Sequence, residues 1–161
     1  MFKDEPNERI DPRALKSWFI SGFLLGLVLL TIPASYIILV SAAWNLPTLW
    51  GWLGIAVVAI FTIWSAIIAP RFRIRFWRYE IRKNEIDIQH GIFIVRRTLI
   101  PMVRVQHVDT EHGPVMRLFG LATLRISTAA TYHYIPALSK EKASELMGEI
   151  ASLARLSDED V

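Results

Sequence analysis

The sequence contains no cysteine, and it carries no charged residue of either sign between residues 18 and 70. The lack of cysteine excludes a disulfide framework and a thiol nucleophile. No glycine-rich phosphate loop is present either. These absences remove several common enzyme classes and direct attention to the long uncharged run.

The uncharged run is 53 residues long. A helix needs about 20 apolar residues to cross a hydrocarbon core, so the run is long enough for two crossings. Asn45 and Pro47 favour a turn midway, and the tryptophans around them are typical of a membrane–water interface. The sequence therefore predicts helices over 18–44 and 49–69, which together form a transmembrane hairpin.

Two alternatives explain the same run. One is a buried helical hairpin in a soluble protein, but the remaining 91 residues after position 70 are too few to cover two such helices. The other is a cleaved signal peptide, whose apolar region is usually only about 7–15 residues long and is not followed by a second span. We favour the hairpin.

Charge is concentrated where the hairpin ends. Residues 71–83 hold six basic residues and one acidic residue, whereas 84–161 hold eight basic and ten acidic residues. The high pI of about 9.4 therefore comes from one short segment and not from a basic domain, which argues against a nucleic-acid-binding domain. Arg13 and Lys16 precede the first helix, so the positive-inside rule predicts that both termini are cytoplasmic.

The basic junction itself has two interpretations. The segment "RFRIRF" alternates like a strand, but its arginines also fit helical spacing. Pro70 and the aromatic residues favour the extended form. Beside an anionic membrane these arginines can attract lipid headgroups, although topology alone also explains them. The candidate membrane-surface residues are Arg71, Arg73, Arg75 and Arg78.

The rest of the chain predicts short strands followed by one helix. Ser139 suits a helix N-cap, and the apolar residues after it recur at helical spacing. This stripe is expected to pack on a sheet, and 157–161 is expected to be an acidic tail. The predicted strands are 77–81, 86–91, 92–101, 103–110, 121–128 and 131–135, and a seventh is expected if the first or third is split. The apolar stripe consists of Ala143, Leu146, Met147, Ile150, Leu153 and Ala154.

Three motifs in this region resemble the bacterial pleckstrin-homology (PH) domain of small two-span membrane proteins, the YdbS-like group. They are "IxIxxG" ending at Gly91, "IPxxRVQxV" ending at Val108, and "GPxxRLFGLATLxISTA" ending at Ala129. The resemblance implies an α+β membrane protein: a two-helix transmembrane hairpin followed by a PH-like β-barrel or sandwich of six or seven antiparallel strands, capped by a C-terminal helix. It also implies, as first expected partner, a larger membrane protein with the same domain. It supplies no catalytic or ligand residues.

The expected organisation follows. Residues 1–17 form a cytoplasmic N-terminal segment, 18–70 the hairpin in the cell membrane, 71–156 a cytoplasmic PH-like domain and 157–161 the tail. Gly91 and Gly120 are expected at positive φ, and Phe119 and Leu121 in the core. The fragment 75–156 is expected to fold without the hairpin.

The sequence gives weak support for a metal site or a catalytic site. The segment "HVDTEH" contains His107, Asp109, Glu111 and His112, and the first two share a strand face, but His112 lies beyond the expected strand end. Polar surface residues explain the segment better than a metal site, and His90 and His133 are likewise expected at the surface. We expect no enzyme activity, no cofactor and no metal.

Two function classes remain. The first is a membrane-anchored interaction module, which uses a strand edge or the groove beside the last helix to bind a membrane protein or a second copy of itself. The second is a reader of anionic phospholipid headgroups. Topology explains Arg96 and Arg97 least, so they are the candidate contacts for a ligand or partner.

Overall fold

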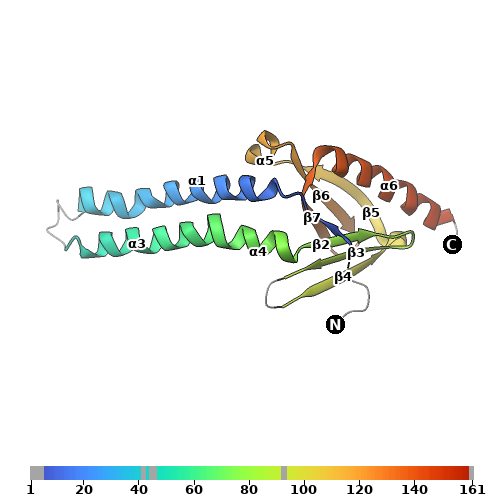
Figure 1. Cartoon of the computed structure of the whole chain (residues 1–161), viewed down its shortest axis with the longest axis horizontal. Coiled ribbons are helices and arrows are strands. Elements are labelled where there is room, and N and C mark those ends of the chain that lie inside the picture. The colour runs from blue at the N-terminus through green and yellow to red at the C-terminus, as the bar shows by residue number, and fades with distance from the viewer. Residues whose placement is uncertain (1–5, 41–42, 44–46, 92–93, 160–161) are drawn as a thin grey trace. The chain divides into compact units, whose positions relative to one another are not determined.

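The computed structural model describes residues 6–40, 43, 47–91 and 94–159 (Figure 1). The chain divides into two compact units. One contains Leu15–Arg71, and the other combines the residues up to Ala14 with those from Phe72 onward.

The first unit is helical and largely apolar. It contains most of α1 (Ala14–Ser35), the π-helical η1 (Tyr36–Val40), α3 (Leu49–Ile63), the π-helical η2 (Trp64–Ile68) and the start of α4 (Ala69–Phe76). Two stretches, Ala14–Leu39 and Leu49–Phe76, are long and apolar enough to cross a membrane, and only 17% and 6% of their most apolar windows are buried. Exposed apolar helices suit lipid and argue against a buried hairpin. The predicted turn at Asn45 lies outside the described residues.

The prediction of an extended "RFRIRF" is wrong, because this segment is helix α4. Pro70 lacks the N–H that a regular helix would use, and the π-helical turn before it absorbs the change in hydrogen-bond register. Accordingly, the Ala69 N–H donates to the Trp64 carbonyl, five residues back. The helix then continues until the Trp77 N–H bonds the Arg73 carbonyl.

The second unit contains two antiparallel sheets. The strand order is β1-β2-β3-β4 in one sheet and β5-β6-β7 in the other, and η3 (Met102–Arg104) connects them. The strands are β1 (Glu8–Arg9), β2 (Arg78–Ile81), β3 (Glu85–His90), β4 (Arg96–Pro101), β5 (Val105–Glu111), β6 (Leu121–Thr128) and β7 (Tyr132–Ser139). With the C-terminal helix, this arrangement confirms the predicted PH-like sandwich after a two-helix hairpin.

The seventh strand comes from the N-terminal segment. Within the described residues no predicted strand is split; instead, β1 pairs with β2, with Glu8 opposite Tyr79. Burial and a hydrogen bond to Glu8 raise the pKa of Tyr79. Ile10 and Ala14 are buried as well. Residues 6–14 therefore contribute to the core of this unit, although they were expected to belong to a separate segment.

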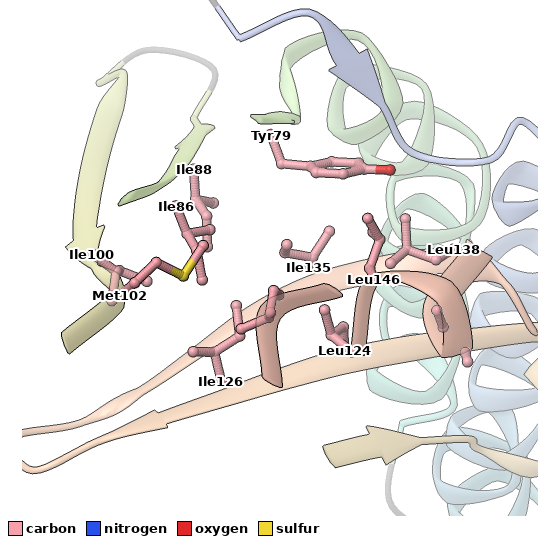
Figure 2. Packing of buried hydrophobic residues seen from close by; sticks show 13 residues of the cluster. Tyr79, Ile86, Ile88, Ile100, Met102, Leu124, Ile126, Ile135, Leu138 and Leu146 are labelled. Carbon is pink, nitrogen blue, oxygen red and sulfur yellow. The ribbon is translucent and has the colours of Figure 1, made fainter. Parts of the chain in front are cut away.

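The C-terminal helix α6 (Lys140–Glu159) closes the core. Its N-cap is confirmed, since the Ser139 hydroxyl accepts a hydrogen bond from the Lys142 N–H at 3.1 Å. The helix reaches Glu159, so the expected tail is partly helical. Figure 2 shows side chains of both sheets and of α6 pointing toward one another. The buried cluster contains Tyr79, Ile86, Ile88, Ile100, Met102, Ala122, Leu124, Ile126, Ile135, Leu138, Ala143, Leu146 and Ile150.

The expected special positions are mostly confirmed. Gly91 and Gly120 have φ values of 122° and 62°. Leu121 is buried. Phe119 is only partly buried and does not belong to the core cluster. It lies just after the short helix α5 (Pro114–Leu118).

Candidate interaction surface

The arginines of the basic junction do not share one face. Arg71, Arg73 and Arg75 are all exposed on α4. A strand would have placed all three side by side, but a helix places Arg71 and Arg75 one turn apart and turns Arg73 away. Arg78 is partly buried at the start of β2. Their contact with lipid stays a prediction.

Arg96 and Arg97 have different surroundings. Arg97 forms a double contact with the carboxylate of Asp87, and the shortest distance is 2.6 Å. Asp87 is completely buried, whereas the Arg97 side chain is 15% exposed. Arg96 is exposed and has no ion pair within the described part of the chain. Arg97 therefore has a structural partner, and Arg96 is the member of the pair available for an external contact.

Strand β4 forms an open edge. It pairs with β3 on one side, and no strand among the described residues pairs with its other side. Val95, Leu99 and Val103 along this edge are 45%, 51% and 49% exposed. A hollow of about 720 Å³ includes Val95 and Leu99, and another of about 480 Å³ includes Leu99 and Val103. Apolar side chains next to unpaired backbone are the features that β-augmentation uses.

Basic residues lie at both ends of this edge. Arg96 begins β4, and Arg104 ends η3 just beyond it. Both are exposed, and neither forms an ion pair with another residue that the structure describes. We call the set Val95, Arg96, Leu99, Val103 and Arg104 the β4 edge. Its exposed apolar side chains, with an arginine near each end, fit an extended apolar segment that carries acidic residues near its ends.

The "HVDTEH" segment is occupied by an internal ion pair network. Arg125 on β6 contacts Asp109 at 3.1 Å and Glu111 at 2.8 Å. His112 lies beyond the end of β5, as expected. Among the described residues, no group of three or more histidines and acids lies close enough to hold a metal ion. Arg125 thus pairs with both carboxylates.

Sequence reasoning missed the environment of His90. Its ring stacks on Trp77, with centroids 4.7 Å apart and an interplanar angle of 18°. Burial, and the nearby charge of Arg96, lower the pKa of His90, and burial also lowers the pKa of His133. Both residues are partly buried, so neither is a fully solvated surface histidine. Trp77 was expected only as the first residue of a strand, and no sequence signal paired it with His90.

The comparisons with known proteins agree with this architecture. The family described as "Bacterial PH domain" matches residues 17–154. The chain is 45% identical to the UPF0699 transmembrane protein YdbS of Bacillus subtilis (strain 168) over 161 residues, which cover 99% of both chains. It is also 30% identical to the UPF0699 transmembrane protein YdbT of the same organism over 76 residues, which cover 47% of this chain and 15% of that protein. No solved structure matches the chain.

Proposed function

Because the chain belongs to the bacterial PH-domain family, among membrane proteins, we propose that it is a membrane-anchored interaction module without catalytic activity. In this proposal, the β4 edge binds an extended segment of a partner membrane protein. The supporting observation is the open edge itself, which presents three exposed apolar side chains and two arginines that lack ion pairs in the described part of the chain. The family description and the names of the relatives mention a domain and a membrane location, and no reaction.

The partner we propose is a larger membrane protein that carries a PH-like domain of its own. The similarity to YdbT supports this choice, since a 76-residue match makes up only 15% of that protein. Similar sequences thus occur within a much larger transmembrane protein. A second copy of this chain is the competing occupant, and the experiment below separates the two.

The orientation belongs to the same proposal. Arg13 and Lys16 precede α1, and the basic junction follows the second apolar stretch, so both termini face the cytoplasm of the cell. Reporter fusions at residue 161 and in the loop near Pro47 test this orientation. Alkaline phosphatase activity from the fusion at 161 would reject it.

Site-specific crosslinking tests the partner. A photoreactive amino acid replaces Leu99 in the β4 edge, and in a matched control it replaces Tyr134, which is exposed on β7 of the other sheet. The chain is co-expressed with YdbT of Bacillus subtilis, the larger relative. We expect a crosslink to that protein from position 99 and none from position 134. A crosslink from position 99 to a second copy of this chain, or equal yields from both positions, would reject the proposed partner.

Binding of anionic headgroups is the second candidate function, and the three exposed arginines of α4 favour it. About 1 kcal/mol of attraction is typical for each basic residue close to an anionic surface. Native mass spectrometry of the purified chain measures the retained phosphatidylglycerol. Replacing Arg71, Arg73 and Arg75 with Gln should reduce it, whereas Arg96→Gln should not. Equal retention by both variants would limit the α4 arginines to a role in topology.

A further inference from the structure

A hollow of about 360 Å³ lies where β5, α5 and α6 meet, away from the β4 edge. It is lined by His112, Arg117, Gly120, Leu121 and Lys140. His112 follows β5, Arg117 lies in α5, and Lys140 begins α6. Three segments that are distant in sequence therefore bring three nitrogen-bearing side chains to one place.

The backbone of Gly120 holds these segments together. Its carbonyl accepts a hydrogen bond from the Lys140 N–H at 2.9 Å, and its N–H donates to the Arg117 carbonyl at 3.1 Å. Figure 1 shows α5 beside the start of α6, as these two bonds require. Gly120 has a φ of 62°, which a residue with a side chain rarely adopts. The positions of Arg117 and Lys140 are thus fixed by local backbone contacts.

The basic side chains of this hollow have no internal counterion. Within the described part of the chain, Arg117, Lys140 and His112 form no ion pair and no side-chain hydrogen bond. The nearest acids along the chain are Glu111, which contacts Arg125 at 2.8 Å, and Glu141, which does not line the hollow. Among the residues that the structure describes, no acid lines the hollow. The result is a concave site of positive charge with donors that remain unused.

We propose that this hollow binds a phosphate group. The Arg117 guanidinium can donate two parallel hydrogen bonds to phosphate oxygens, and Lys140 supplies a compact positive charge. His112 can add a donor from a ring nitrogen. The N-terminus of α6 adds a favourable dipole because its first N–H groups lie at the same end as Lys140. The phosphate belongs either to a small soluble molecule or to a lipid headgroup, since both present the same oxygens.

Calorimetric titration of the full-length chain with pyrophosphate tests the site. The chain is placed in phosphatidylcholine nanodiscs at low ionic strength. The site variant carries Arg117→Gln and Lys140→Gln, and the control carries Arg96→Gln and Arg104→Gln, which remove the same charge from the β4 edge. We expect binding by the native chain and the control, and affinity lower by about tenfold or more in the site variant, as the loss of charge-assisted hydrogen bonds implies.

Two further measurements complete the test. Near-UV circular dichroism of the site variant should match the native chain, because both replaced side chains are exposed. Nanodiscs with added phosphatidic acid identify the source of the phosphate, with nanodiscs that contain phosphatidylglycerol of equal charge as the comparison. If pyrophosphate binds more weakly in the phosphatidic acid nanodiscs, the lipid headgroup competes for the hollow and is its ligand. If pyrophosphate binds equally in both, the ligand is a soluble phosphate. Equal affinities of the site variant and the control, or no binding to the native chain, would overturn the proposal.

Discussion

Asp87 lies on β3 between Ile86 and Ile88, and all three residues are buried. The carboxylate is separated from water, and its charge is balanced by Arg97 on the neighbouring strand β4. The contact is diagonal, because Gln89 and not Asp87 is directly opposite Arg97. A buried charge is tolerated when its partner forms good hydrogen bonds, and the double contact provides them. At the scale of single residues, Arg97 thus belongs to the fold.

Because of this contact, Arg96 and Arg97 should contribute differently to the stability of the fold. Arg97→Ala would leave the buried carboxylate of Asp87 without its partner, and the free energy of unfolding should fall by about 3–5 kcal/mol. Arg96→Ala, at an exposed position, should change it by less than about 0.5 kcal/mol. Chemical unfolding of the detergent-solubilised chain, followed by near-UV circular dichroism, measures both. Similar effects of the two substitutions would contradict the structural role of Arg97.

His90 should make stability depend on pH. Its pKa is lowered in the folded chain, so folding favours the neutral ring. The contribution is fully present above the unfolded value of about 6.5 and decreases as the pH falls below it. His90→Phe keeps a ring against Trp77 and should flatten the decline in unfolding midpoint between about pH 7 and pH 5, apart from the part due to His133.

His107→Phe is the matched control for this pH dependence. His107 is exposed on β5, so this substitution should leave the slope of stability against pH as it is in the native chain. A slope that stays the same in His90→Phe would show that protonation of His90 is not linked to folding.

At the scale of secondary-structure elements, periodicity predicted the elements that bury one face. The stripe of α6 is an example, because burial of a single face leaves a regular apolar pattern. The pattern "RFRIRF" satisfied both periods, and the hydrogen bonds of the preceding helix decided the outcome. The two residues of β1 are too few to show any period.

The same limit applies to the candidate site. Residues 71–83 were recognisable as a basic junction, but the difference between Arg96 and Arg97 depends on a contact with Asp87, ten positions earlier. The hollow at Arg117 and Lys140 depends on the meeting of three distant segments. Neither arrangement leaves a local signal in the sequence.

The two apolar helical stretches contact each other through glycine. A Cβ atom at Gly22 would lie 2.9 Å from the Cα atom of Ala66, and one at Gly26 would lie 2.2 Å from the Thr62 hydroxyl. The backbone at Ala66 cannot move aside as a flexible side chain can. Close approach of this kind is how helices associate in lipid, where packing replaces the hydrophobic effect.

Gly22→Leu should therefore separate the helices of the hairpin. We expect a loss of stability of at least about 1–3 kcal/mol, the usual cost of overpacking. Unfolding of the chain by increasing SDS in mixed micelles measures it. Leu24→Phe is the control, since Leu24 is 49% exposed and can accept a larger side chain. Equal midpoints for both variants would contradict the close contact.

At the scale of the whole molecule, the PH-like unit is formed by two separate parts of the sequence. The residues up to Ala14 belong to the unit that resumes at Phe72, and the helical unit is inserted between them. Lys142 on α6 and Glu8 on β1 lie 3.8 Å apart, and the Asp11 N–H bonds the Ala137 carbonyl at 2.9 Å. Each contact joins the two ends of the sequence, so the N-terminal segment is part of the PH-like fold.

A fragment that lacks this segment should therefore be less stable than one that includes it. Residues 72–161 alone would lose β1 and the buried Ile10, and burial of one such side chain contributes about 1.5–3 kcal/mol. Joining 6–14 to the start of 72–161 through a flexible Gly/Ser linker should restore the stability, and urea unfolding measures each fragment. The same fusion with Ile10→Asp controls for the added length and should restore little, because an unpaired charge would enter a buried position. If 72–161 alone unfolds at the same urea concentration as the fusion, the N-terminal segment adds nothing to the fold, and the expectation that 75–156 folds by itself would stand without it.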